Sequence, residues 1–185
     1  MRKQIADLIA GFKYYYQVGK LQQRLIDMNY TELGIGSARV VYRISPTRVM
    51  KIALNTAGKY QNMQEYVMSN SYKKYFLTKT YSEYNDYKVI VSEYVDQLTN
   101  AKFNAIYGTG FSRFSRIILW DKPTNVKRDS EVFIRLVDDV RKFCKDTGTP
   151  LDEFSDIWQW GFDGKKAKIL DYGLTDKIFR RWYRK

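Results

Sequence analysis

The spacing of hydrophobic residues changes along the chain, and these changes predict an alternation of helical and extended segments. The elements expected in the first half are a helix over residues 3–28, three strands over 30–54, a helix over 55–76, and strands over 77–84 and 87–95. The first helix is amphipathic, is expected to break near Gly19, and packs against the sheet in this prediction. The second helix places Tyr60, Met63 and Val67 on one face. The first half therefore predicts a five-stranded sheet with one inserted helix.

The second half begins with an irregular stretch and becomes regular after Ser130. Residues 96–128 predict a mixture of helix and loop, whereas the apolar residues after Ser130 form the stripe of a core helix. Gly148 and Pro150 terminate that helix. Cys144 lies on the stripe, so we expect a buried structural thiol rather than a nucleophile.

Composition and charge exclude several classes of chemistry. The 185 residues contain one cysteine and no histidine, which excludes an internal disulfide, a Ser-His triad and a histidine base, and gives no basis for a zinc site. Lysine and arginine outnumber aspartate and glutamate by 32 to 20, so the net charge of +12 favours a large acidic partner, either protein or nucleic acid. The chain lacks an apolar run of about twenty residues and the pattern of a signal peptide. We therefore expect no membrane insertion and an intracellular location.

Two regions carry residues suited to a nucleotide and its metal ion. A turn that contains Gly34 and Gly36 precedes a strand with Lys51 in its centre, and backbone amides and an ammonium group arranged in this way stabilise phosphates. Acidic and amide side chains gather on both sides of a predicted hairpin, whose turn is Phe162-Asp163-Gly164 and whose second strand covers 165–170. Carboxylate and amide oxygens are suitable ligands for Mg²⁺. ATP with Mg²⁺ is therefore the candidate cofactor.

The order of these parts resembles the protein-kinase-like fold. The stretch that begins at Gly34 is similar to the kinase glycine loop G-x-G-x-x-G-x-V, with Arg39 in place of the third glycine. The strand around Lys51 resembles the one that carries the phosphate-binding lysine, and Glu65 is the candidate helix partner of that lysine. Asp171-Tyr172-Gly173 resembles the Asp-Phe-Gly motif, whose aspartate holds magnesium. The ending of the sequence is also similar to small truncated kinase-like proteins of tailed bacteriophages.

This resemblance implies a minimal kinase-like α+β fold and a set of site residues. The implied parts are an N-terminal helix over 1–29, an N-lobe with a five-stranded antiparallel sheet over 30–95, and a reduced, mostly helical C-lobe with a basic tail over 96–185. The implied nucleotide-binding residues are Gly34, Gly36, Ser37, Val49, Lys51, Glu65 and the backbones of Glu93 and Val95, with Ser92 as gatekeeper. The implied magnesium ligands are Gln159 and Asp171.

The sequence departs from an active kinase at its catalytic loop. The motif H-R-D-x-x-x-x-N is absent, and Gln159 stands in for its metal-binding asparagine. Asp152 or Asp156 could act near the position of the catalytic base, although neither has the spacing of the motif. The sequence after Gly173 leaves no room for the helices that bind protein substrates, so we do not expect a conventional protein kinase. Arg39 could either clamp a phosphate or block it.

Three functions remain open at this point. The first is a catalytically degenerate kinase-fold protein that acts as a binding or structural module, for instance in a phage virion or as a regulator in the host cytoplasm. The second is an atypical Mg-ATP-dependent phosphotransferase that uses Lys51, Glu65 and Asp171. The third is a nucleic-acid-binding activity of the basic residues Arg113, Arg116, Lys122, Lys127, Arg128, Arg180, Arg181, Arg184 and Lys185.

Overall fold

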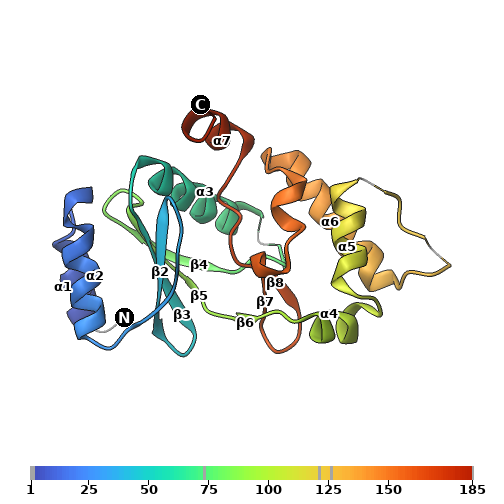
Figure 1. The fold of residues 1–185 in the computed structure, drawn as a ribbon, viewed down its shortest axis with the longest axis horizontal. Helices are drawn as coiled ribbons and strands as arrows, with labels where there is room; N and C mark the ends of the chain where they lie inside the picture. The colour runs from blue at the N-terminus through green and yellow to red at the C-terminus, as the bar shows by residue number, and fades with distance from the viewer. Residues whose placement is uncertain (1–2, 73, 121, 126, 185) are drawn as a thin grey trace. The chain divides into compact units, whose positions relative to one another are not determined.

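The computed structural model describes residues 3–72, 74–120, 122–125 and 127–184. The chain divides into two compact units (Figure 1). The first unit comprises residues 1–73 and 79–94, and the second comprises residues 74–78 and 95–185. The fold is α+β, and it contains a five-stranded antiparallel sheet. Among the described residues, none of the helices has the length and apolar character needed to cross a membrane.

The first unit consists of the five-stranded sheet and three α-helices. Its elements are α1 (Lys3–Ala10), the 3-10 turn η1 (Tyr15–Gln17), α2 (Val18–Asp27), β1 (Thr31–Ile35), β2 (Arg39–Ser45), β3 (Arg48–Ala53), α3 (Thr56–Tyr72), β4 (Thr80–Tyr84) and β5 (Val89–Glu93). The strand order is β1-β2-β3-β5-β4. Two of the strands are shorter than predicted, since β4 begins at Thr80 and β5 ends at Glu93.

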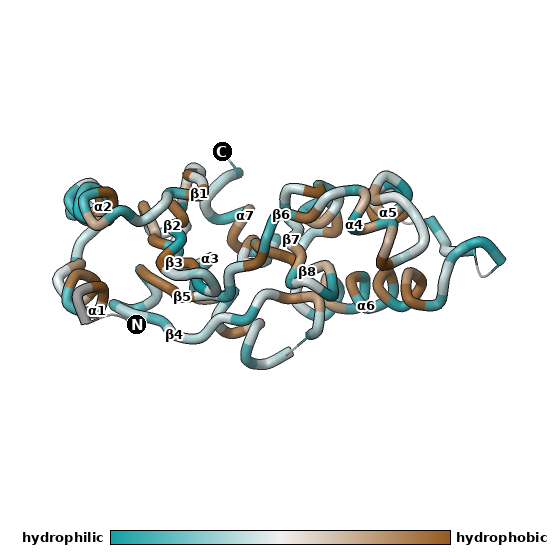
Figure 2. The backbone as a smooth tube through the Cα atoms, turned by 90° about the horizontal axis from the view of Figure 1, so that it is seen from below, coloured by the Kyte–Doolittle hydropathy of each residue, from teal (hydrophilic) through white to brown (hydrophobic). Residues whose placement is uncertain are grey.

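The sheet lies between two helical layers, with α1 and α2 on one face and α3 on the other (Figures 1 and 2). Ile9, Phe12 and Leu21 are buried in one core cluster with Met50 and Ile52 of the sheet. The prediction that the N-terminal segment packs against the sheet is therefore confirmed. Burial of an apolar helix face against apolar strands stabilises a fold by about 25 cal/mol for each Å² removed from water.

The predicted break near Gly19 is wrong, because Gly19 lies inside α2. The helix ends instead at Ala10, and the chain turns between Gly11 and Tyr14. The side chain of Gln17 closes this turn, since its Oε1 accepts hydrogen bonds from the backbone N–H groups of Lys13 (2.8 Å) and Tyr14 (2.9 Å). A glutamine three residues after a break satisfies backbone donors that a helix start leaves without intrahelical partners.

The second unit is mostly helical and contains a small three-stranded sheet. Its elements are β6 (Asp96–Gln97), α4 (Asn100–Tyr107), α5 (Phe111–Leu119), α6 (Glu131–Thr147), the 3-10 turns η2 (Leu151–Phe154) and η3 (Ile157–Gln159), β7 (Trp160–Phe162), β8 (Ala167–Ile169) and α7 (Asp176–Trp182). The irregular stretch 96–128 thus contains two helices, α4 and α5. The strand order is β6-β7-β8.

The core helix of the second unit is α6, which shows alternating hydrophobic and hydrophilic segments in Figure 2. Ser130 caps its N-terminus by accepting a hydrogen bond from the backbone of Phe133, and Gly148 ends it in the left-handed conformation at φ 69°. Cys144 is buried on this helix, as predicted. The predicted β7–β8 hairpin is also confirmed.

Candidate functional site

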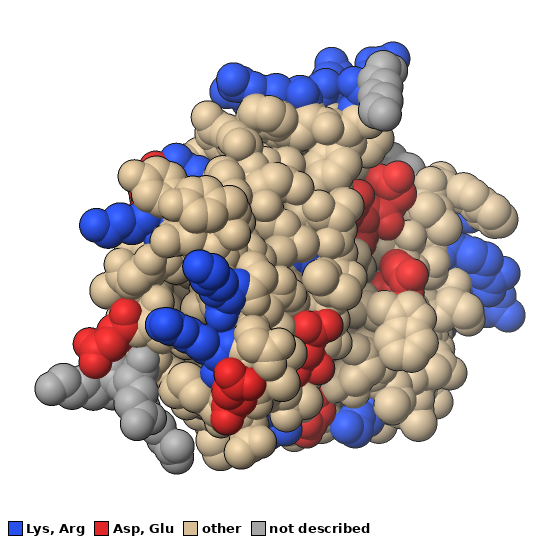
Figure 3. Space-filling view, turned by 60° about the vertical axis from the view of Figure 1, so that its left-hand side comes forward, with Lys and Arg blue, Asp and Glu red and all other residues tan. Residues whose placement is uncertain are grey.

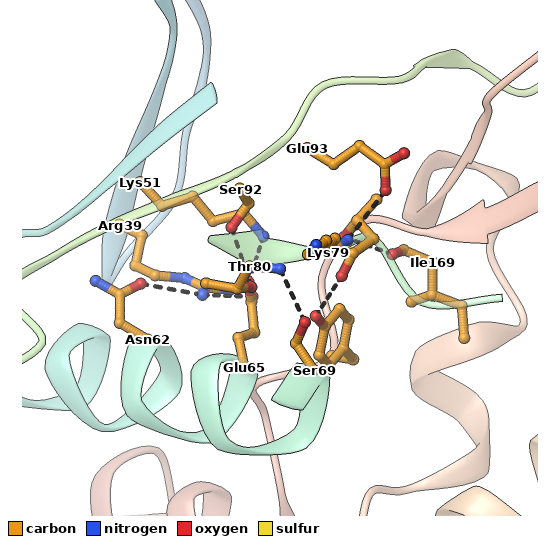
Figure 4. Close-up of polar contacts among 12 residues, drawn as sticks. Arg39, Lys51, Asn62, Glu65, Ser69, Lys79, Thr80, Ser92, Glu93 and Ile169 are labelled. Carbon is orange, nitrogen blue, oxygen red and sulfur yellow. Dashed lines mark hydrogen bonds and ion pairs between the residues drawn. The ribbon is translucent and has the colours of Figure 1, made fainter. Parts of the chain in front are cut away.

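Three charged side chains meet between the sheet and α3 of the first unit, and we refer to them as the Arg39–Glu65–Lys51 cluster (Figure 4). One carboxylate oxygen of Glu65 lies 2.6 Å from Nη1 of Arg39, and the other lies 2.6 Å from Nζ of Lys51. The exposed fractions are 6% for Arg39, 5% for Lys51 and 0% for Glu65. The ion pair between Lys51 and Glu65 that the sequence predicted is therefore present. The sequence had not identified Arg39 as a second partner of Glu65.

The alternation of side chains along β2 and β3 explains why these cations face α3. Met50 and Ile52 belong to the core under α1 and α2, so Lys51 between them points to the opposite face of the sheet. Val40 belongs to the same core, and Arg39 next to it likewise points away from that core. The same alternation could have identified Arg39 from the sequence, since the apolar residues at alternate positions of β2 fix which face it occupies.

Polar rather than apolar residues form the buried face of α3. Gln61, Asn62, Glu65 and Ser69 are buried, whereas Val67 is 44% exposed. Met68 is also buried, at 3% exposed, so this face is mostly rather than entirely polar. Buried polar groups need hydrogen-bond partners, and the sheet supplies them. Ser69 Oγ accepts from the backbone N–H of Thr80 at 2.8 Å, and Asn62 Nδ2 donates to the carbonyl of Tyr87 at 2.9 Å.

The start of α3 is fixed to the turn between β1 and β2. Asn55 caps the helix through Oδ1, which accepts from the backbone N–H of Gly58, and its Nδ2 donates to the carbonyl of Ser37. Gly58 passes so close to the turn that a Cβ there would lie 2.0 Å from the carbonyl oxygen of Ala38. Only glycine permits this approach. The helix that carries Glu65 is thereby held at a defined position beside the sheet.

Gly34 and Gly36 differ from Gly58, because the fold itself does not require glycine at either position. The prediction that both lie in the turn is wrong for Gly34, which lies inside β1, whereas Gly36 directly follows that strand. Neither Gly34 nor Gly36 has a positive φ. A Cβ at Gly34 would meet nothing within 4 Å, and one at Gly36 would have the carbonyl oxygen of Arg39 as its nearest neighbour, at 3.9 Å. The turn is closed by a 2.8 Å hydrogen bond from Gly36 N–H to that carbonyl. Both positions therefore have open space where a side chain would stand.

The structure restricts the predicted adenine-binding backbone of β5. The N–H of Glu93 donates to the carbonyl of Lys79 at 2.7 Å, so this group is not available to a ligand. Glu93 also pairs with Arg48 in the ladder between β3 and β5. Ser92, at the predicted gatekeeper position, is fully buried and its Oγ lies 3.2 Å from Oγ1 of Thr80. Val49 is buried opposite Ser92 in the register of β3 and β5.

The remaining predicted residues lie in the second unit. Val95 packs against Gly161 and is 8% exposed. The β7–β8 hairpin brings the magnesium candidates near each other, since the N–H of Leu170, next to Asp171, donates to the carbonyl of Gln159 at 2.8 Å. Within the described part of the chain, no three acidic, histidine or cysteine side chains are grouped so as to hold a metal ion. The magnesium site therefore stays a prediction based on Gln159 and Asp171.

The two candidates for the catalytic base differ in their surroundings. Asp156 is committed to the backbone, because its Oδ1 caps η3 by accepting from the N–H of Trp158 at 3.0 Å. Asp152 is exposed at the start of η2. Its neighbour Glu153 was missed by sequence reasoning: burial, reinforced by the charges of Asp171 and Asp152, raises the pKa of Glu153. An acidic neighbourhood therefore exists beside Asp171.

The tyrosine of the Asp-Tyr-Gly sequence belongs to the core of the second unit. Tyr172 is 1% exposed, and its hydroxyl donates to the carbonyl of Thr78 at 2.6 Å. Its ring packs edge-on against Phe143 of α6 with 6.4 Å between the ring centres. This buried anchor fixes the backbone next to Asp171.

The basic residues proposed for nucleic-acid binding do not all remain available. Arg113 forms a two-pronged ion pair with Asp129, with distances of 2.7 and 2.9 Å. Lysine and arginine side chains do gather beside the C-terminus, over α7, at the top of Figure 3. Elsewhere on the face shown, basic and acidic side chains are interspersed. The view thus shows a local basic region at α7 rather than a uniformly basic face.

The fold and site define an α+β protein with a buried lysine–glutamate pair beside a glycine-containing hairpin. Neither a protein-family profile nor a curated protein matches the sequence. Any assignment of function must therefore be argued from the chemistry of the residues themselves.

Proposed function

We propose that this protein is a catalytically degenerate member of the kinase-like fold that acts as a binding or structural module and retains a phosphate-binding arrangement in its first unit. The observation that supports this best is the Arg39–Glu65–Lys51 cluster. A lysine held by a helix carboxylate at 2.6 Å, in the strand next to a hairpin with two unobstructed glycines, has parts that a nucleotide phosphate requires. Little exposure to water strengthens the attraction between buried cations and an anion.

The loss of catalysis in this proposal follows from the residues around the expected catalytic loop. The sequence contains no histidine, so the H-R-D motif cannot be present. Asp156 is engaged as a cap of η3, which leaves the exposed Asp152 as the candidate for orienting a phosphate acceptor. Arg39 stands where the glycine loop would have its third glycine and shares Glu65 with Lys51. A bound nucleotide would then regulate or stabilise the module rather than be consumed.

The partner of such a module would be acidic, because the net charge of +12 attracts anionic macromolecules. The similarity of the sequence ending to kinase-like phage proteins suggests a virion component or a host protein as the setting. These partner assignments rest on charge and resemblance alone.

A second candidate function is an atypical Mg-ATP-dependent phosphotransferase. The Lys51–Glu65 pair favours it, as does the acidic neighbourhood of Asp171, Asp152 and Glu153 in the second unit. In this alternative, Asp171 and Gln159 would hold the magnesium ion, which would neutralise phosphate charge. Lys51 would bind the α and β phosphates.

Calorimetric titration with Mg-ATP, combined with an assay for phosphate release, separates the two candidates. The variants are Lys51→Met and, as a control, Lys13→Met, which removes an exposed lysine of the same unit. Binding by wild type and by Lys13→Met, lost in Lys51→Met and without phosphate release, supports the degenerate module. Phosphate release that depends on Lys51 supports the phosphotransferase. If wild type binds no Mg-ATP, both nucleotide-binding proposals are refuted.

A further inference from the structure

A cavity in the second unit lies among Tyr75, the end of α4, the start of α6 and the β7–β8 turn. Its volume is about 490 Å³, which falls within the range of about 300–1,000 Å³ for small-molecule sites. Its lining consists of two tyrosines, two aliphatic residues, three cations and one carboxylate, namely Tyr75, Tyr107, Ile106, Val132, Arg135, Lys165, Lys166 and Glu131. None of these residues belongs to the candidate site of the first unit.

The two tyrosines give one part of the cavity wall an aromatic and uncharged surface. Tyr107 is 2% exposed and packs on Phe103 with 4.5 Å between the ring centres. Burial raises the pKa of both phenols, to about 12 in the case of Tyr75. Both therefore remain neutral at physiological pH, so neither repels an anion. Ile106 and the 55% exposed Val132 add an apolar wall against which a flat organic group would pack.

The cations stand around the ring of Tyr75. The guanidinium carbon of Arg135 lies 5.9 Å and Nζ of Lys166 lies 5.5 Å from the centre of this ring. Lys165 precedes Lys166 in the same exposed turn, so three positive charges line one cavity. A cation beside an aromatic face is attracted to the ring and also attracts anions. A phosphate or a carboxylate is the natural anion for lysine and arginine.

Carboxylates near the cavity are fewer or already engaged. Glu131 lines the cavity and is the one carboxylate in its lining. Asp139 lies 3.8 Å from Arg135 and 3.7 Å from Lys74. Asp163 accepts hydrogen bonds from the backbone N–H groups of the β7–β8 turn and lies 3.6 Å from Lys168. The lining therefore carries three positive charges against one negative charge, although Arg135 shares its charge with Asp139, which is not part of the lining.

We propose that this cavity binds a small aromatic phosphate, with the phosphate between Arg135 and the lysines of the β7–β8 turn and the aromatic group against Tyr75 and Val132. The aliphatic and aromatic lining selects for the ring, and the three cations select for the phosphate. The site is separate from Lys51 and does not depend on the function proposed above.

The test uses phenyl phosphate as the probe and calorimetry as the measurement. The test variant is Lys165→Gln with Lys166→Gln, which changes two exposed side chains. The matched control is Lys142→Gln with Lys145→Gln, which removes the same charge from the exposed side of α6 outside the cavity. We expect about a tenfold weaker affinity in the test variant, equivalent to about 1.4 kcal/mol, and wild-type affinity in the control. Lys51→Met should bind the probe as wild type does.

Inorganic phosphate and phenol separate the two parts of the recognition. We expect both to bind more weakly than phenyl phosphate, because each offers only one of the two features. The proposal is overturned if wild type does not bind phenyl phosphate, if the test variant binds as tightly as the control, or if inorganic phosphate binds as tightly as phenyl phosphate. It is also overturned if Lys51→Met abolishes binding, since the probe would then occupy the first unit.

Discussion

Replacement of Glu65 by glutamine should destabilise the first unit more than replacement of either cation that it contacts. The substitution keeps the shape of the side chain but leaves Arg39 and Lys51, each 2.6 Å from it and nearly buried, facing a neutral group. Removal of one partner from a buried ion pair costs about 3–5 kcal/mol. Arg39→Met leaves Glu65 paired with Lys51, so its cost should be nearer the value for a hydrogen bond to a charged group, about 1.5–3 kcal/mol.

Urea unfolding followed by far-UV circular dichroism measures this difference, provided that the slope of the transition is the same for all variants. The four tryptophans, at positions 120, 158, 160 and 182, all lie in the second unit, so their fluorescence reports on that unit alone. A loss for Glu65→Gln equal to or smaller than that for Arg39→Met would refute the reasoning, because Glu65 would then not be the shared counter-ion.

Three further outcomes follow from the geometry. Burial raises the pKa of the Cys144 thiol to about 12, so iodoacetamide at pH 8 should alkylate the native protein far more slowly than the denatured chain; equal rates would contradict its burial. Arg113 holds the pKa of Asp129 below its ordinary value, so this pair stabilises the fold above about pH 4 and loses that contribution as the pH falls through the lowered pKa. The stability difference between wild type and Arg113→Met should therefore shrink on acidification, and a constant difference would contradict the pairing. Asn85 donates to two carbonyls at the end of α1 from a left-handed conformation at φ 54°, so Asn85→Gly should lose about 1–3 kcal/mol in urea unfolding and Asn85→Ala more, because alanine also bears the backbone strain; equal losses would exclude that strain.

The sequence predicted the strands of the first unit in which alternating apolar residues determine the face on which each side chain lies. Met50 and Ile52 had to face a hydrophobic layer, and this requirement alone directs Lys51 toward the helix that carries Glu65. The choice of Glu65 as its partner came from the resemblance to kinases, not from this pattern. The strand order was not predicted, because periodicity does not specify which strands pair.

The parts that could not be predicted depend on polar contacts between distant residues. The buried face of α3 carries Asn62 and Ser69, whose burial is favourable only because backbone groups of the sheet pair with them. Hydrophobic spacing contains no information about such partners. The turn after β4 is similar: three successive residues from Asn85 have positive φ without any glycine, and contacts outside the turn hold them there.

The second unit was harder to predict for a related reason. Short helices such as α4 and α5 are separated by only a few residues, so neither displays enough turns for a clear period. The acidic neighbourhood of Glu153 likewise depends on the β7–β8 hairpin, which returns Asp171 to the vicinity of η2. Spacing along the sequence alone did not indicate that Glu153 would be half-buried.

In the proposed function, the β1–β2 hairpin with Gly36 and the Arg39–Glu65–Lys51 cluster together bind the phosphates of a nucleotide. Calorimetric titration of Gly36→Ala with Mg-ATP, with the unfolding curve of the same variant, tests it most directly, because the space at Gly36 is open and the fold does not require glycine there. We predict stability within about 0.5 kcal/mol of wild type and weaker Mg-ATP binding. Wild-type affinity in this variant would contradict the claim.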